Sequence, residues 1–100
     1  MPSIVQINFP YSESQDDLES HSVEAAGRFV DVEGLRWKVW LVDENTKTAG
    51  GIYLFENREK ADAYAAGDLV AHLKNVREGV KVSVFDTIDE AGKVTNAPID

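Results

Sequence analysis

Aromatic side chains in the middle of the sequence are its best candidates for a binding site. Their indole and phenol rings offer flat apolar walls and a hydrogen-bond donor. That combination suits a planar aromatic ligand and can direct an N–H or O–H group at a developing oxyanion. Aromatic residues also gather in cores and interfaces for the area they bury, so packing is the alternative role for each ring. The candidate substrate-binding residues are Trp37, Trp40, Tyr53, Phe55 and Tyr64.

Proton transfer at such a site has three candidates, which are Tyr53, Tyr64 and His72. None of them stands in a polar cluster that would mark a general base, so the sequence leaves the catalytic base unassigned. The second histidine, His21, is expected to pack at a core boundary, with a proton shuttle at a pocket mouth as the alternative.

Two cations lie on the same stretch as the tryptophans. Arg36 and Lys38 share a strand face with Trp40, because side chains alternate between the two faces of a strand. We expect both to be charges at the rim of the sheet that pair with surplus carboxylates. Binding of a substrate anion is their alternative role.

Other kinds of site have little support in the sequence. The chain has no cysteine, and its two histidines form no H-x-x-x-H pattern, so we expect no metal. No serine lies in a G-x-S-x-G elbow. Gly50-Gly51 lacks the lysine of a phosphate loop and is expected to shape a turn or bulge. We therefore expect no cofactor, although the sequence leaves flavin binding open.

Composition narrows the class of protein further. The 100 residues predict a single domain, 1–100, and a hydrophobic fraction of 43% predicts that it folds. With 10 basic against 18 acidic residues, the net charge of −8 argues against nucleic acid and anionic membranes as partners. No stretch is long and apolar enough for a membrane span or an export signal, so we expect a cytoplasmic protein.

Hydrophobic periodicity predicts strands and helices in the order β-α-β-β-α-β. This order is typical of an α+β ferredoxin-like plait, a four-stranded antiparallel sheet with two helices on one face. Residues 89–100 are expected to form a loose or partner-contacting tail. The expected elements are a strand at 3–9, a helix capped by Ser14, strands at 34–44 and 52–55, a helix from Asn57 to about Val76, and a strand at 80–88.

The second helix is expected to be interrupted near Gly67. A regular helical period that buries Tyr64 would turn Asp68 and His72 inward. One extra residue near the glycine would return three apolar residues to the buried face, namely Leu69, Leu73 and Val76. The pattern therefore predicts a π-bulge or kink between residues 65 and 69.

Both faces of the predicted sheet are apolar. Trp37 and Val39 lie on one face of their strand, and Trp40 and Val42 lie on the other. Two helices can cover only one face, and no further element is predicted to cover the second. We therefore expect a homodimer through the open sheet face.

Residues 34–64, GLRWKVWLVDENTKTAGGIYLFENREKADAY, resemble the YdhR-like monooxygenase family of the dimeric α+β barrel group. The matching features are Trp37-Lys38-x-Trp40, the segment AGGIYLFE, Ala63-Tyr64 and Leu73-Lys74-Asn75. The resemblance implies a homodimer whose two sheets pack face to face. It also implies a relation to cofactor-independent oxygenases of polycyclic aromatic substrates. In this family the activity is itself inferred from relatedness, and no catalytic set carries over.

Two functions follow as hypotheses. The first is a cofactor-independent monooxygenase acting on a small planar aromatic substrate, a phenol or enol, bound between the helix layer and the sheet. The alternative is a non-catalytic dimeric module that binds a small aromatic molecule or serves an interaction. A base within an aromatic-lined pocket would favour the first hypothesis.

Overall fold

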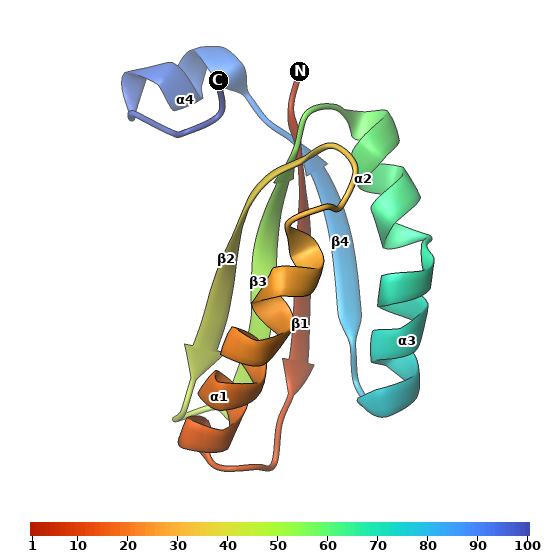
Figure 1. Ribbon diagram of the computed structural model, residues 1–100. Helices are drawn as coiled ribbons and strands as arrows, with labels where there is room; N and C mark the ends of the chain where they lie inside the picture. Colours follow the sequence, from red (N-terminus) through yellow and green to blue (C-terminus); the bar gives the residue numbers. More distant parts are fainter.

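A computed structural model describes residues 1–100 and contains one antiparallel sheet of four strands in the order β2-β3-β1-β4. Helices α1, α2 and α3 cover one face of this sheet (Figure 1). The strands are β1 Ser3–Pro10, β2 Leu35–Asp43, β3 Thr48–Phe55 and β4 Lys81–Asp86. The helices are α1 Gln15–Ala26, the 3-10 turn η1 Gly27–Phe29, α2 Arg58–Ala65, α3 Asp68–Val76 and α4 Asp89–Val94. The predicted ferredoxin-like plait is confirmed. None of the helices has the length and hydrophobicity that a membrane span requires.

Side-chain caps define where the first two helices begin. The Ser14 hydroxyl accepts a hydrogen bond from the Asp17 amide at 3.1 Å, as the sequence predicts. The Asn57 side chain accepts one from the Lys60 amide at 2.9 Å. Each cap satisfies a backbone donor that the helix leaves free, a contribution of about 1 kcal/mol.

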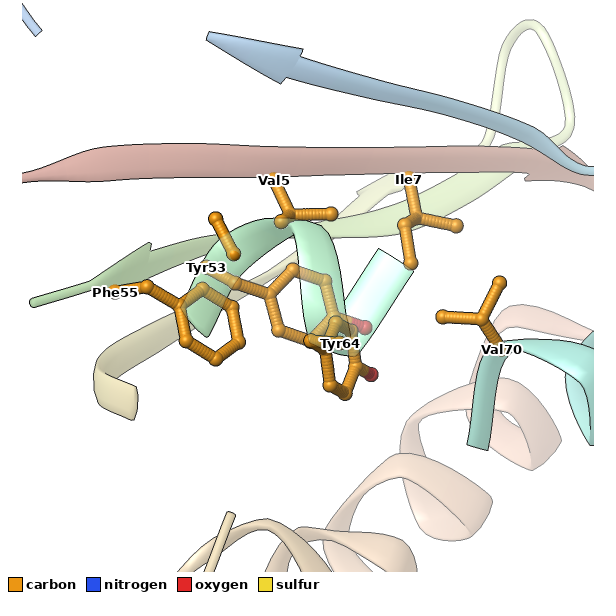
Figure 2. Packing of buried hydrophobic residues seen from close by; sticks show 7 residues of the cluster. Val5, Ile7, Tyr53, Phe55, Tyr64 and Val70 are labelled. Carbon is orange, nitrogen blue, oxygen red and sulfur yellow. The ribbon is translucent and has the colours of Figure 1, made fainter. Parts of the chain in front are cut away.

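The core lies between the sheet and the helices α2 and α3. Val5 and Ile7 of β1 point toward Tyr53 and Phe55 of β3 and toward Tyr64 of α2 (Figure 2). Ala61 and Val70 complete this cluster. Since complete burial of a large apolar side chain contributes roughly 1.5–3 kcal/mol, the cluster fixes α2 and α3 on the sheet.

The predicted interruption of the second helix is confirmed and goes further than a bulge. Helix α2 ends at Ala65, and Gly67 caps a separate helix α3 in an extended conformation. After the break Val70 is buried, while Asp68 and His72 are exposed. The expectation that Leu69 and Val76 turn into the core is wrong, because the break rotates Val70 inward and leaves Leu69 41% and Val76 62% exposed.

Strand β3 is longer than expected, because the glycine pair lies inside it. Gly50 and Gly51 pair with β1 and β2, and the hairpin turn spans residues 44–47 instead. A Cβ atom at Gly50 would lie 1.9 Å from the carbonyl oxygen of Ile7. The glycine therefore permits the close approach of two strands, and its assignment to a turn or bulge is wrong.

The C-terminal segment is ordered against β2 and is not a loose tail. Helix α4 lies beyond the end of the sheet, near both chain termini (Figure 1). The Trp37 indole N–H donates to the Pro98 carbonyl at 2.8 Å, and Arg36 donates to the Ile99 carbonyl at 3.3 Å. Ile99 is buried. Contact of this segment with a partner remains a prediction.

The sheet face opposite the helices has apolar side chains from all four strands. Strand pairing places Trp37 opposite Leu54 and Ile4 opposite Phe85. These positions alternate with the residues that face the core. Leu54 lies on this face but is already completely buried within the chain. We refer to the remaining set as the open face: Ile4, Trp37, Val39, Leu41, Ile52 and Phe85.

Candidate functional site

A cavity of about 400 Å³ lies between α1 and α3 above the sheet. Its walls come from the two helices, with Leu18 and Ser22 on one side and Leu73 and Val76 on the other. Its floor comes from the strands and includes Ile7, Phe9, Trp40, Ala49 and Tyr53. The volume and the apolar lining suit a small planar molecule. A smaller hollow of about 290 Å³ lies between α1 and the edge strand β2.

Four of the predicted site residues meet at this cavity. Trp40, Tyr53, Tyr64 and His72 all line it. Phe55 does not, because it is completely buried beside Tyr64, with ring centroids 5.2 Å apart.

Trp37 belongs to the open face and not to the cavity. A register shift between Leu35 and Trp37 sets the alternation of β2, so that Trp37 pairs with Leu54 and Trp40 pairs with Gly51. Between the two tryptophans, only Trp40 therefore contacts the cavity, where its ring lies 5.4 Å from that of Phe29 in an edge-on arrangement.

Tyr53 of β3 and Tyr64 of α2 lie next to each other in the cavity lining, with their rings tilted by 39°. Their ring centroids are 5.0 Å apart, and Figure 2 shows both hydroxyl groups on the same side of the core cluster. Burial raises the pKa of both phenols, and the rise is larger for Tyr53. The neighbouring Tyr64 also contributes to the rise at Tyr53. Both hydroxyls therefore stay protonated at neutral pH and can donate hydrogen bonds, but neither is a base.

Lys38 was expected at the rim of the sheet, but the structure places it in the cavity. Its Nζ atom lies 3.2 Å from the Trp40 ring centroid, 3.6 Å from that of Phe29 and 4.5 Å from that of Tyr53. It lines the cavity, forms no salt bridge, and has a pKa lowered to about 7 by burial alone. The sequence did show that Lys38 shares a strand face with Trp40. It could not show which face of the strand the helices cover, so it did not predict that Lys38 lies in the cavity.

Space for the Lys38 side chain depends on the absence of a side chain at Gly51, which pairs with Trp40. A Cβ atom at Gly51 would lie 3.0 Å from the Lys38 Cε and 3.2 Å from the Tyr53 ring. Both distances are tighter than ordinary packing. Gly51 thus lets the lysine lie across the cavity floor.

The two histidines lie at the mouth of the cavity. His21 and His72 line it from opposite helices, and both side chains are exposed. Beside them Arg77 donates two hydrogen bonds to Glu13, at 2.8 and 2.6 Å, which join the end of α3 to the segment before α1. This hydrogen-bonded Arg77 lowers the pKa of Glu13 to about 2. No three His, Asp or Glu side chains lie close enough together to hold a metal ion.

Residues 4–98 match the protein family described as "Putative mono-oxygenase ydhR". The chain belongs to this family. The match spans nearly the whole domain, whereas the sequence resemblance was strongest over residues 34–75. No protein of curated function matches the sequence.

Solved structures share the fold at low sequence identity. NE2512 from Nitrosomonas europaea, of unknown function, has a TM-score of 0.67 and 12% identity over 87% of this chain and 89% of its own. Rv0793 from Mycobacterium tuberculosis has a TM-score of 0.66 and 15% identity, over 91% of this chain and 99% of its own. SnoaB, a cofactor-independent oxygenase from Streptomyces nogalater, has a TM-score of 0.65 and 12% identity, over 87% of this chain and 93% of its own. Identities this low establish the fold alone.

The cavity of this ydhR family member combines three chemical features. Trp40 and Phe29 provide aromatic surfaces, Tyr53 and Tyr64 provide neutral donors, and Lys38 provides an amine without a counter-ion. Together they can bind a planar ring and stabilise a negative charge on its oxygen atom.

Proposed function

We propose that the protein is a cofactor-independent monooxygenase that acts on a small planar aromatic substrate, a phenol or enol, in the cavity between α1 and α3. The observation that carries the proposal is the aromatic-lined cavity with two neutral phenol donors in its lining. Membership of the ydhR family and the shared fold of SnoaB, a cofactor-independent oxygenase, support it.

The chemistry that we propose needs no external reductant. Loss of a proton turns the phenol or enol into an electron-rich anion, which reacts with dioxygen. The overall reaction is counted on the keto tautomer of the substrate, which has a methylene group. This methylene group and one dioxygen molecule give a carbonyl group and one water molecule, and the substrate supplies all four electrons. The protein's part is to bind the ring, to hold the anion with the Tyr53 and Tyr64 hydroxyls, and to exclude water. His72 at the mouth is placed to exchange protons with solvent.

Oxygen uptake by metal-free and flavin-free protein tests this function. We expect uptake with anthrone-like or dihydroxyaromatic compounds, together with a change in tryptophan fluorescence, because Trp40 borders the cavity. A fluorescence change without uptake would select the alternative of a binding module. If neither signal appears with any compound of the panel, the oxygenase proposal fails.

We further propose that a second copy of the chain covers the open face. Phe85 is 53% exposed and Val39 is 49% exposed on opposite edge strands, and apolar residues of β1 and β3 lie between them. The C-terminal segment contacts Arg36 and Trp37 of β2 but leaves Val39 and Phe85 exposed. An apolar surface of this kind is expected to be covered, and a second copy of the chain would cover it. Such an arrangement would pack two sheets face to face, with the cavities on the outer sides.

A further inference from the structure

Lys38 has no anionic partner, unlike three other cations of the chain. Lys60 pairs with Glu33, Arg77 pairs with Glu13, and Arg58 pairs with two aspartates. The groups around the Lys38 Nζ atom are the rings of Trp40, Phe29 and Tyr53. Ring faces attract a cation, but they do not neutralise it.

The cavity around Lys38 is basic although the protein is acidic. Its lining has three basic residues and both histidines of the chain, but only one acidic residue. The whole chain has 18 acidic against 10 basic residues, so this distribution is the reverse of the average. Besides Lys38, the charged and imidazole groups of the lining are His21, Glu24 and Arg28 from the α1 side and His72 and Arg77 from α3.

Most of those groups lie at the mouth and not beside the amine. His21, Glu24, Arg28 and His72 are exposed, and Arg77 is held by Glu13. Burial is the only cause that lowers the pKa of Lys38 to about 7. An anion placed on the floor would therefore meet Lys38 as its one uncompensated positive charge away from solvent.

We propose that Lys38 is the general base and the anion-binding group of the cavity. Its neutral amine takes the proton from the hydroxyl of a phenol or enol, and the resulting ammonium holds the oxyanion. This assignment rests on the proposed function, which requires a base but does not name one.

Atoms and charges balance in this step. The substrate O–H bond breaks, an N–H bond forms at Nζ, and a neutral pair becomes an ammonium–oxyanion pair without any redox change. The aromatic substrate would pack against the perpendicular rings of Trp40 and Phe29, with its hydroxyl group toward the Nζ atom that lies over both. The Tyr53 hydroxyl is on the same floor and donates to the same oxygen atom.

A chromogenic phenol tests the assignment without turnover. We use 4-nitrophenol, whose phenolate is yellow, and follow its colour when bound as the pH is changed. In the wild-type protein the pKa of the bound phenol should fall by at least about one pH unit, because the cation favours the phenolate. Its methyl ether, 4-nitroanisole, has no acidic proton and reports whether the cavity still binds a ring.

Two substitutions of Lys38 separate its roles. In Lys38→Met the fall in the phenol pKa should disappear while 4-nitroanisole still binds. In Lys38→Arg the fall should persist, but oxygen uptake with an active substrate should drop at least about 10²-fold, because a guanidinium cannot accept a proton. The matched control is Lys47→Met, since the Lys47 Nζ lies 4.7 Å from the Tyr11 ring outside the cavity. This control should behave as wild type.

The possible results distinguish a failure of the proposed Lys38 role from a failure of the proposed oxygenase function. A lowered phenol pKa in wild type and Lys47→Met but not in Lys38→Met supports the assignment, even if no substrate consumes oxygen. An unchanged phenol pKa in wild-type protein that binds 4-nitroanisole overturns the role of Lys38 and leaves the oxygenase with another base. Persistence of the lowered pKa in Lys38→Met also overturns it. If Lys38→Met does not fold, full oxygen uptake by Lys38→Arg overturns the base role.

Discussion

Burial acts in opposite directions on the ionisable groups of the cavity floor. It raises the pKa of Tyr53 and Tyr64, because a phenolate would lose solvation there. It lowers the pKa of Lys38 to about 7, because an ammonium would lose solvation as well. Both effects favour neutral groups. A neutral amine accepts a proton and neutral phenols donate hydrogen bonds, so different side chains can supply the base and the oxyanion donors.

Removal of one phenol hydroxyl tests its role as an oxyanion donor. Tyr53→Phe should lower the rate of oxygen uptake by about 10²–10³-fold and leave 4-nitroanisole binding unchanged, because the ring remains. The matched control is Tyr11→Phe. The Tyr11 hydroxyl is buried without a hydrogen-bond partner and lies outside the cavity lining. Its removal should keep the rate and raise the unfolding free energy by about 1 kcal/mol, measured in urea.

Lys38 also gives protein stability a characteristic pH dependence. Its pKa is about 7 when folded against 10.5 for the free side chain, so the unfolded chain binds more protons between these pH values. The unfolding free energy contributed by this group therefore rises with pH across that range. We expect Lys38→Met to lose this rise, which we put at about 1–2 kcal/mol after allowing for solvent screening. Urea unfolding of both proteins at several pH values measures the difference, and parallel curves would contradict it.

At the scale of elements, an ion pair connects the two walls of the cavity. Arg77 at the end of α3 binds Glu13, just before α1, through two hydrogen bonds. The pKa of Glu13 falls from 4.5 to about 2, so the stabilisation is complete above pH 4.5 and is lost as the pH falls toward 2. Glu13→Gln should cost about 1–3 kcal/mol of unfolding free energy at neutral pH and little near pH 2. An equal loss at both pH values would contradict this account.

The glycine pair of β3 offers two neighbouring substitutions with different outcomes. Gly50→Ala would place a methyl group 1.9 Å from the Ile7 carbonyl oxygen, which only a shift of β1 could relieve. We expect a loss of at least about 3 kcal/mol or failure to fold. In Gly51→Ala the nearest atom is the flexible end of Lys38, at 3.0 Å. This variant should fold, with weaker 4-nitroanisole binding, as circular dichroism and fluorescence would show.

Local signals in the sequence predicted the elements well. Ser14 and Asn57 act as helix caps, and the conflict between Tyr64 and Asp68 on one helical face marked the break at Gly67. These features depend on neighbouring residues alone, so the sequence contains them directly. The ordered C-terminal segment was missed because its contacts with Arg36 and Trp37 join positions more than 60 residues apart.

The site was predicted only in part, because it depends on register. Alternation separated Trp37 from Trp40, but it could not show which of them the helices cover. The bulge between Leu35 and Trp37 decides this, and it turns Lys38 inward with Trp40. The same residue that resembled a surface charge thereby becomes the central cation of the cavity.

Across the whole molecule, the charge distribution favours a neutral substrate that ionises after it binds. The net charge of −8 repels anions at long range, and this repulsion is screened beyond about 10 Å at moderate salt. The basic groups of the cavity act only at short range. A neutral phenol would thus reach the cavity unopposed and form its anion next to Lys38.

The proposed dimer can be tested by single charges on the open face. Light scattering of the wild-type protein at micromolar concentration should give twice the 11.1 kDa mass of one chain. Phe85→Lys and Val39→Lys should each give the mass of one chain, because a buried unpaired ammonium opposes association. Both side chains are about half exposed in a single chain, so each substitution should change protomer stability by less than about 0.5–1 kcal/mol.

The matched control for those two variants lies on the helix side. Val30→Lys introduces the same charge at a residue that is 79% exposed and does not belong to the open face. It should remain a dimer, and so should Lys38→Met, whose substitution lies on the opposite side of the sheet. A wild-type mass of 11.1 kDa would exclude the dimer. Dissociation by Val30→Lys, with Phe85→Lys still dimeric, would place the interface on the helices, where a partner would close the mouth of the cavity.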